Sequence, residues 1–220
     1  VGIINEQQLR NAFDIAKSKS ASGRVLVQKQ FTTEELKDIR VTIMNGKFMG
    51  ALLRTPAYVV GDGHSTVLQL IQHENTTFRG TAYVDKVAKI DISKAKAFLG
   101  SELILKILPK DEKMSVLGIG NYGAGGELTN VSDLVPEWMK DESVFVAESI
   151  GVVNAGIDYL VAGKLSPQLS NSIENVVLIE VNKNPAVFMH DIASGKNDTI
   201  KAYVDYIESF DFFESDWIRT

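Results

Sequence analysis

The stretch Ile179-Glu180-Val181-Asn182-Lys183-Asn184-Pro185 decides how this chain is interpreted. It follows an apolar run at 176–178, so it is expected to end a buried strand, and the proline after it stops the ladder. Side chains two positions apart in a strand point to the same face, so Glu180 and Asn182 project together. A carboxylate beside an amide oxygen suits a hard cation such as Mg²⁺.

A second apolar segment, 155–161, carries an acid inside a run that should be buried. If this strand neighbours the first, Asp158 joins Glu180 and Asn182 as a third oxygen ligand. The competing interpretation is that Glu-x-Asn is only a polar strand end facing water. A short motif taken alone favours that interpretation, because such motifs match by chance.

Composition excludes several classes of protein. The chain has 220 residues, of which 45% are hydrophobic, which is enough for one sizeable core. Its net charge of −5 argues against a nucleic-acid binder. The absence of cysteine excludes disulfides and a cysteine nucleophile, and it fits the cytoplasm. No apolar run approaches the roughly 20 residues of a membrane span.

The first third of the chain predicts a small β-α-β unit and then a hairpin. Strands are expected at 1–4 and 25–27, with a helix between them that Asn5 caps and that runs to about Lys19. Asn45-Gly46 is a strong hairpin signal between strands 39–44 and 48–53. We therefore expect two domains, 1–31 and 32–220.

Helices and turns are expected to follow the hairpin. A turn at 61–63 leads to a helix capped by Ser65 or Thr66, then a surface loop at 74–82. Further helices are expected at 93–99, from Asp133 to about 153, and from Asp198 onward. The aromatic residues of the acidic tail, 208–216, could dock on a partner subunit, so a homo-oligomer is one expectation.

Five ordered stretches together resemble one family, the ATP-grasp carboxylate–amine ligases, and among these cyanophycin synthetase and the glutathione synthetase module of the bifunctional glutathione-forming enzyme. The stretches are Asp38-Ile39-Arg40, Arg54-Thr55-Pro56-Ala57 with 61–66, Asn121 to Gly126, Gly156-Ile157-Asp158, and Glu180 to Pro185. The resemblance covers nearly the whole chain. It outweighs the competing interpretation, in which Glu180 and Asn182 are only a polar strand end facing water.

The resemblance implies an α+β ATP-grasp fold, with an essentially complete C-terminal lobe and a partial lid lobe. It implies a ligase that uses ATP and Mg²⁺ to activate a carboxylate as an acylphosphate, which an amine of an amino acid or peptide then attacks. Further domains are expected in the native chain.

The resemblance also implies roles for particular residues. Those that match the Mg²⁺ ligands are Asp158, Glu180 and Asn182. Those that match the adenine-binding hinge are Gln28, Lys29, Gln30 and Phe31, and Asp38 matches an acid at the ribose. Arg54 matches an arginine that faces substrate or the transferring phosphate, which suits its planar fork. Asn121 and the glycines after it match a loop whose N–H groups can meet an oxyanion.

The chain departs from the family in three places. The glycine-rich phosphate loop and lysine of the family lie upstream of the segment matching Val1. An arginine expected shortly before Asn121 is replaced by residues of the run 117–119, Leu-Gly-Ile, and Gln28 stands where relatives have Glu. These departures favour an alternative, a non-catalytic nucleotide-binding or scaffold module.

Other motifs are weaker. The run 118–123 satisfies G-x-G-x-x-G, but a dinucleotide site needs a helix opening at the loop and an acid at a later strand end. The three histidines, His64, His73 and His190, are scattered and are expected in loops or at the surface. For His190, which follows the Asn-Pro turn, the alternative is a place in the wall of a substrate pocket.

Overall fold

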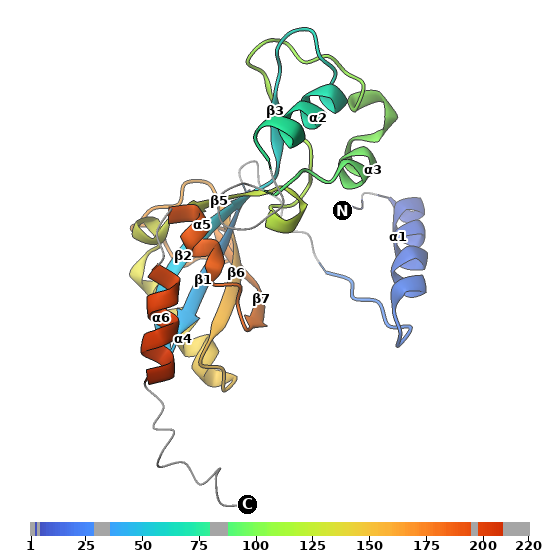
Figure 1. The fold of residues 1–220 in the computed structure, drawn as a ribbon. Helices are drawn as coiled ribbons and strands as arrows, with labels where there is room; N and C mark the ends of the chain where they lie inside the picture. The colour runs from blue at the N-terminus through green and yellow to red at the C-terminus, as the bar shows by residue number, and fades with distance from the viewer. Residues whose placement is uncertain (1–2, 4, 29–35, 80–87, 195–197, 209–220) are drawn as a thin grey trace, which may run out of the picture. The chain divides into compact units, whose positions relative to one another are not determined.

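The computed structural model describes residues 3, 5–28, 36–79, 88–194 and 198–208 (Figure 1). The chain divides into two compact units, Val1–Thr33 and Glu34–Thr220. This division falls two residues from the expected boundary at 31/32. The identification of the units with a lid lobe and a C-terminal lobe stays a prediction.

The first unit contains one helix, α1 (Glu6–Lys19), among its described residues. The Asn5 side chain accepts a hydrogen bond from the Gln8 N–H at 2.9 Å, so the expected cap is confirmed. The expected strand at 25–27 is wrong, because residues 24–28 join no ladder and Leu26 is 79% exposed. An apolar run becomes a strand only where a neighbour takes its backbone hydrogen bonds. The expected strand at 1–4 falls mostly on residues outside those described.

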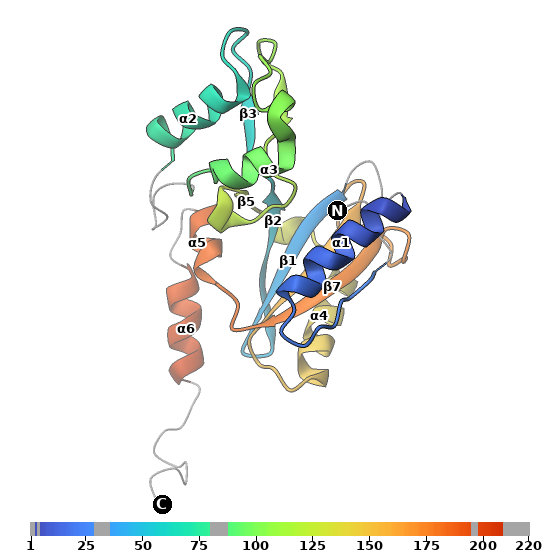
Figure 2. The same ribbon diagram turned by 90° about the vertical axis from the view of Figure 1, so that its right-hand side faces the viewer.

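The second unit is built on a five-stranded antiparallel sheet in the order β5-β2-β1-β6-β7 (Figures 1 and 2). Its strands are β1 (Leu36–Met44), β2 (Lys47–Thr55), β5 (Glu127–Asn130), β6 (Ala155–Ala162) and β7 (Val176–Lys183). The β1–β2 hairpin turns at Asn45 and Gly46 as expected. Both have positive φ, 51° and 67°, which is the conformation that an Asn-Gly hairpin turn requires.

A smaller ribbon of β3 (Tyr58–Val60) and β4 (Lys113–Ser115) packs with α2 (Val67–Thr77) and α3 (Ile92–Leu103) (Figure 2). Thr66 caps α2 through a complete capping box with Gln69, as expected. The sequence predicts Ser93 as the cap of the helix at 93–99, but Asp91 caps α3, since its side chain accepts from the Lys94 N–H. Helix α2 also extends into the region expected to be a loop, because Glu74 to Thr77 are helical.

Helix α4 (Glu137–Ser149) covers one face of the large sheet and begins later than expected. Asp133 lies in a short 3₁₀ turn, η2 (Ser132–Leu134), and Pro136 occupies the N-cap. The reason is steric: a residue before proline avoids the helical region, and Val135 has ψ 125°. Helices α5 (Phe188–Ser194) and α6 (Asp198–Glu208) follow β7, and α6 starts at the expected residue.

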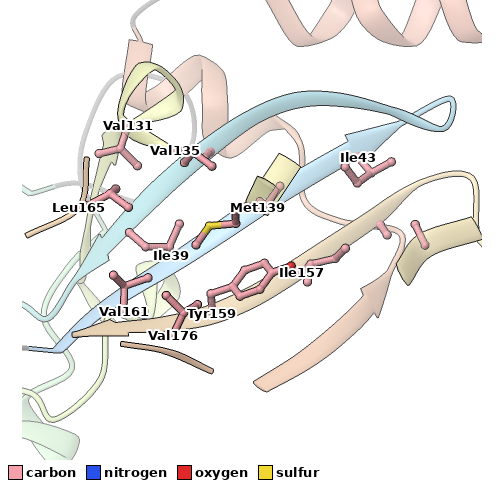
Figure 3. Close-up of a cluster of buried hydrophobic side chains, with 14 residues drawn as sticks. Ile39, Ile43, Val131, Val135, Met139, Ile157, Tyr159, Val161, Leu165 and Val176 are labelled. Atoms are coloured by element: carbon pink, nitrogen blue, oxygen red, sulfur yellow. The ribbon is translucent and has the colours of Figure 1, made fainter. Parts of the chain in front are cut away.

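Strand alternation separates the two faces of the sheet. Ile39, Ile157 and Tyr159 point from neighbouring strands into the core beside Met139 of α4 (Figure 3). The residues between them, such as Asp38 and Asp158, therefore face the other side. The interaction that buries the core thus also fixes which polar groups share the opposite face.

Strand β7 is not the buried strand that its apolar sequence predicts. Among the strands that the structure describes it pairs with β6 alone, which makes it an edge strand of the described sheet, and Leu178 and Ile179 are 36% and 49% exposed. The sequence pattern of a buried strand and of an apolar edge strand is the same. In the part of the chain that the structure describes, no helix is long and apolar enough to cross a membrane.

Truncation of a core residue of β6 tests this division of the sheet. Ile157 is fully buried, so Ile157→Ala should lower the free energy of unfolding by about 2–5 kcal/mol. The matched control is Ile173→Ala, which removes the same atoms from a side chain that is 84% exposed and should change stability by less than about 0.5 kcal/mol. Urea denaturation measures both. Equal effects would contradict the assigned core.

Candidate active site

A pocket of about 420 Å³ lies on the face of the large sheet opposite the core. Three parts of the second unit form its walls: strands of the large sheet, the glycine-rich loop before β5, and helix α5. The lining residues are Asp38, Arg40, Arg54, Ile119, Gly120, Asn121, Tyr122, Asp158, Leu160, Ile179, Glu180 and Met189. The structure therefore brings Asp38, Arg54, Asn121, Asp158 and Glu180 of the expected site to one pocket.

Opposite charges alternate across three neighbouring strands of the pocket floor. Asp38 on β1 lies directly opposite Arg54 on β2, and Arg40 on β1 lies directly opposite Asp158 on β6. Arg40 holds both carboxylate oxygens of Asp158, from Nε at 2.7 Å and from Nη2 at 2.8 Å. Arg54 Nη2 bridges the two acids, 2.6 Å from Asp38 Oδ1 and 3.0 Å from Asp158 Oδ2. We call these four residues the charge ladder.

The charge ladder is largely removed from water. The Asp158 and Arg40 side chains are 5% and 14% exposed. Burial raises the pKa of Asp38, and the hydrogen bond from Arg54 opposes this shift only in part. Burial by itself lowers the pKa of Arg54, but its hydrogen bonds and charge interactions with Asp38 and Asp158 together raise that pKa above its ordinary value. Buried charges of this kind are tolerated only when they are paired, so the ladder depends on all four members.

The three expected metal ligands converge at the β6–β7 edge of the pocket. Asp158 pairs directly with Glu180, and the Asn182 amide Nδ2 lies 2.8 Å from Glu180 Oε1 and 3.4 Å from Asp158 Oδ2. A 180° rotation of that amide would replace the N–H donors by an oxygen. With the amide rotated, two carboxylates and one amide oxygen are the kinds of ligand that a hard cation takes, and both Asp158 oxygens also accept from Arg40. Within the described residues, no cluster of three or more His, Asp or Glu offers a competing metal site.

The structure does not test the expected adenine hinge. Gln28 is exposed and belongs to the other unit, and Lys29, Gln30 and Phe31 lie outside the described residues. The adenine-binding role of these four residues stays a prediction. So does the ribose contact of Asp38, which the structure shows bound to Arg54.

The loop 119–126 needs glycine at several positions. A Cβ on Gly120 would lie 2.5 Å from the Arg54 carbonyl oxygen, and Gly125 has φ 104°. The loop passes through a short 3₁₀ turn, η1 (Tyr122–Ala124), and not into an α-helix. With the antiparallel sheet, this rules out the dinucleotide-binding interpretation of G-x-G-x-x-G.

Three of the loop N–H groups that could donate to an oxyanion instead donate to carbonyl groups within the loop. The N–H groups of Ala124 and Gly126 both donate to the Asn121 carbonyl, and Gly125 N–H donates to Tyr122. These amides close the turn, so they do not point toward a ligand. Any oxyanion contact of the loop backbone is left to residues 121–123.

Arg79 binds the backbone of the glycine-rich loop through its guanidinium group. The sequence did not indicate this role, because 74–82 was expected to be a polar surface loop. The Arg79 guanidinium is 4% exposed and donates to the carbonyls of Ala88 at 3.1 Å and Gly125 at 2.5 Å. Glu74 and Glu127 lie 3.5 and 3.4 Å from it. No local pattern marks this residue, because its partners come from segments up to 48 positions away.

Two further residues of this face depart from expectation. Arg40 was part of a recognised motif, but no role was expected of it. His190 is not a loop or surface residue: it lies in α5, is 7% exposed, and its Nε2 is 2.8 Å from the Thr42 hydroxyl. Burial lowers the pKa of His190 to about 4, helped by Arg40 and opposed by Asp191. His190 is therefore neutral at physiological pH.

Comparisons with known proteins show what the chain is similar to. No protein-family model matches it. It is 33% identical over 186 residues to cyanophycin synthetase of Synechocystis sp. strain PCC 6803, covering 81% of this chain and 20% of that protein. It is 32% identical over 183 residues to glutathione biosynthesis bifunctional protein GshAB of Streptococcus mutans, covering 81% of this chain and 24% of that protein.

A solved structure of a related enzyme also resembles this chain. The bifunctional glutathione synthetase of Pasteurella multocida matches 70% of this chain and 21% of its own, with a TM-score of 0.54 and 25% identity. These matches confirm the resemblance inferred from the motifs and the α+β ATP-grasp fold class. The chain spans about a fifth to a quarter of the length of these relatives.

Replacement of Arg79 tests whether it holds the loop. Arg79→Met removes the charge but keeps most of the volume, leaving Glu74 and Glu127 without their cation and two carbonyls without a donor. The free energy of unfolding should fall by about 3 kcal/mol or more, as when one partner of a buried ion pair is removed. Lys106→Met is the matched control, since it removes a cation whose side chain is 45% exposed beside Glu112. That change should cost less than about 1 kcal/mol. A similar small loss for both variants in urea denaturation would show that Arg79 does not hold the loop.

Proposed function

We propose that this chain forms part of an ATP-dependent ligase that joins a carboxylate to an amine of an amino acid or peptide through an acylphosphate. The observation that carries the proposal is the pocket itself. Two oriented guanidinium groups meet there with the carboxylates of Asp158 and Glu180, on adjacent strands of one sheet. Homology to a cyanophycin synthetase and to glutathione biosynthesis proteins supports the same reaction class.

In the proposed reaction, a carboxylate oxygen of the substrate attacks the terminal phosphorus of ATP, and ADP leaves. The amine nitrogen then attacks the acyl carbon, phosphate leaves with the bonding electrons, and the nitrogen loses a proton to water. Both steps build negative charge on phosphoryl and carbonyl oxygens. Donors that are already oriented stabilise such charge without reorganising during the reaction.

Arg54 is suited to that role by its two acidic partners. Asp38 and Asp158 hold its guanidinium from two sides, so the group is oriented toward the pocket before any ligand binds. Arg40 is fixed in the same way by a bidentate bond to Asp158. Asp158, Glu180 and Asn182 would hold Mg²⁺, which supplies neutralisation of the phosphate charge when bound.

A specific observation also favours the alternative of a non-catalytic nucleotide-binding module. Ile119 lines the pocket and is 66% exposed, at the place where the resemblance implies an arginine. One phosphate-facing charge is therefore absent from the loop. Arg40 and Arg54 would have to supply the positive charge for the reaction.

The catalytic proposal is tested by replacing Arg54. In the full-length protein, acceptor-stimulated release of ADP, measured over a panel of amino acids and short peptides, should fall on the order of 10²-fold or more in Arg54→Ala. Arg54→Lys keeps the charge but lacks the planar fork, so it should recover only part of the rate. Arg24→Ala, at an exposed position, is the control and should leave the rate unchanged. If no acceptor stimulates release in the wild type, and Arg54→Ala behaves identically, the non-catalytic module is correct.

The proposed Mg²⁺ site is tested separately by thermal denaturation. Two neighbouring carboxylates should bind the cation in the native state only, so MgCl₂ should raise the Tm of the wild type above that in NaCl of equal ionic strength. Glu180→Gln removes one ligand charge without touching the buried charge ladder, so the Mg²⁺ increment should largely disappear. Glu174→Gln, an exposed glutamate in the loop before β7, should keep it. An increment that survives Glu180→Gln would place the cation elsewhere.

A further inference from the structure

His190 joins helix α5 to the side of the large sheet that carries the pocket. Thr42 follows the core residue Val41 on β1, so its side chain faces the same side as that of Arg40. The Nε2 of His190 lies 2.8 Å from the Thr42 hydroxyl, and the two residues are 7% and 1% exposed. This buried hydrogen bond therefore attaches α5 to β1 in the row of side chains that includes Arg40.

The sheet also leaves space for the imidazole ring. Gly50 on β2 lies directly opposite Thr42 on β1. A Cβ on Gly50 would lie 3.0 Å from both Cε1 and Nδ1 of His190, and 3.1 Å from Ser132 Oγ, which is closer than ordinary van der Waals contact. Gly50 is not among the glycines with positive φ, so the close approach of the ring, and not the backbone conformation, requires glycine here. Two neighbouring strands thus form a defined seat for His190.

The residue next to His190 forms part of the pocket wall. Met189 lines the pocket and is partly exposed, whereas His190 is buried and is not among the lining residues. Successive side chains on a helix point about 100° apart, so the same turn of α5 directs His190 to the sheet and Met189 to the pocket. The position of this wall therefore depends on how α5 is seated.

The segment that leads into α5 is attached to the sheet at its other end as well. A Cβ on Gly156 of β6 would lie 3.2 Å from Pro185 Cβ and 3.4 Å from Arg40 Nε, so Pro185 lies against β6 beside Arg40. Helix α5 itself packs on β2 and β5 (Figures 1 and 2). Met189 thus lies between two points, Pro185 and His190, at which the chain is attached to the sheet.

We propose that His190 is a positioning residue of this site: it seats α5 on Thr42 and Gly50, and so holds Met189 where it contacts a bound substrate. The inference rests on the proposed ligase function for the identity of that substrate. Met189 offers an apolar contact, and either the nucleotide or the amino acid supplies the complementary surface. Because His190 acts on binding and not on the reacting atoms, its loss should weaken binding and leave kcat unchanged.

The test uses variants of the full-length protein that disturb the seat from two strands. Thr42→Val removes the hydroxyl and keeps the shape of the side chain, whereas Thr42→Ser keeps the hydroxyl. Gly50→Ala presses on the ring from β2. The matched control is Ser143→Ala, which removes a buried hydroxyl of the core that is bonded to the Met139 carbonyl at 2.6 Å and to the Tyr159 hydroxyl at 3.0 Å.

Two measurements of binding and one of stability are made on each variant. The nucleotide arm measures Kd for the Mg²⁺ complex of adenylyl imidodiphosphate by calorimetry. The amino-acid arm measures KM and kcat for the amino acid that gives the greatest release of ADP at saturating ATP. Thermal denaturation without ligand gives the Tm.

Thr42→Val and Gly50→Ala should each weaken binding by about 5-fold in at least one arm, with kcat unchanged. The reason is that a ligand binds fully only to molecules in which α5 is seated, and one neutral hydrogen bond corresponds to about this factor. The arm that weakens identifies the ligand that contacts Met189. Thr42→Ser should bind as the wild type does, and Ser143→Ala should lower Tm without changing either arm.

A double-mutant cycle shows whether His190 acts through Met189. Met189→Ala alone should weaken the same arm as Thr42→Val. Once the Met189 side chain is absent, its position no longer matters, so Thr42→Val should cause no further loss of binding in the Met189→Ala background. An equal loss in both backgrounds would overturn the inference, because the seat would then act on the pocket by another route.

Three further results would also overturn it. If Thr42→Val and Gly50→Ala lower Tm but match the wild type in both arms, the seat of His190 is only structural, while the proposed function stands. If Ser143→Ala weakens binding as Thr42→Val does, the effect is a general loss of stability. If the wild type neither binds the nucleotide nor releases ADP, the proposed function falls and the inference falls with it. A wild type that binds the nucleotide without releasing ADP contradicts the ligase alone, and the nucleotide arm then decides the inference.

Discussion

The charge ladder of Asp38, Arg40, Arg54 and Asp158 is the interaction on which the site depends. It exists because the antiparallel register places each acid directly opposite an arginine on the next strand. A shift of one residue would turn these side chains to the core face and the apolar residues to the pocket. The hydrophobic alternation that packs β1 and β6 against α4 therefore also fixes the electrostatics of the opposite face. Stability and the proposed chemistry have one structural origin.

Much of this arrangement could be predicted from local sequence. The Asn45-Gly46 turn, the Asn5 and Thr66 caps and the shared face of Glu180 and Asn182 follow from turn chemistry, capping preferences and strand periodicity, each of which acts over a few residues. Errors arose where a non-local or steric effect prevailed. Pro136 delayed the start of α4 by pushing Val135 out of the helical region, and residues 25–27 lacked a strand to pair with. The apolar β7 became an edge strand, because sequence alone does not state how many neighbours a strand has.

Only some residues of the site could be predicted, again because local sequence patterns do not report contacts between distant residues. Acids and amides on β6 and β7 were found because their spacing along a strand carries the signal. Arg79, His190 and Tyr122 were missed because their importance lies in what meets them in space. Arg79 is a cation beneath a loop 46 residues away, and His190 reaches Thr42 across 148 residues. Tyr122 stands out because its buried hydroxyl has no hydrogen-bond partner among the described residues.

The distribution of charge along the pocket floor gives the site a direction. Two acids and two arginines of the charge ladder balance each other across β2, β1 and β6. Glu180 on β7 then adds a negative charge, and among the described residues no Lys or Arg pairs with it; it accepts a hydrogen bond from the Asn182 amide. The floor is thus neutral across the charge ladder and carries its excess negative charge at Glu180, on the edge strand β7. A ligand with a bound cation complements that edge. The antiparallel register therefore decides both where the charges cancel under the pocket and where one carboxylate is left to face a ligand.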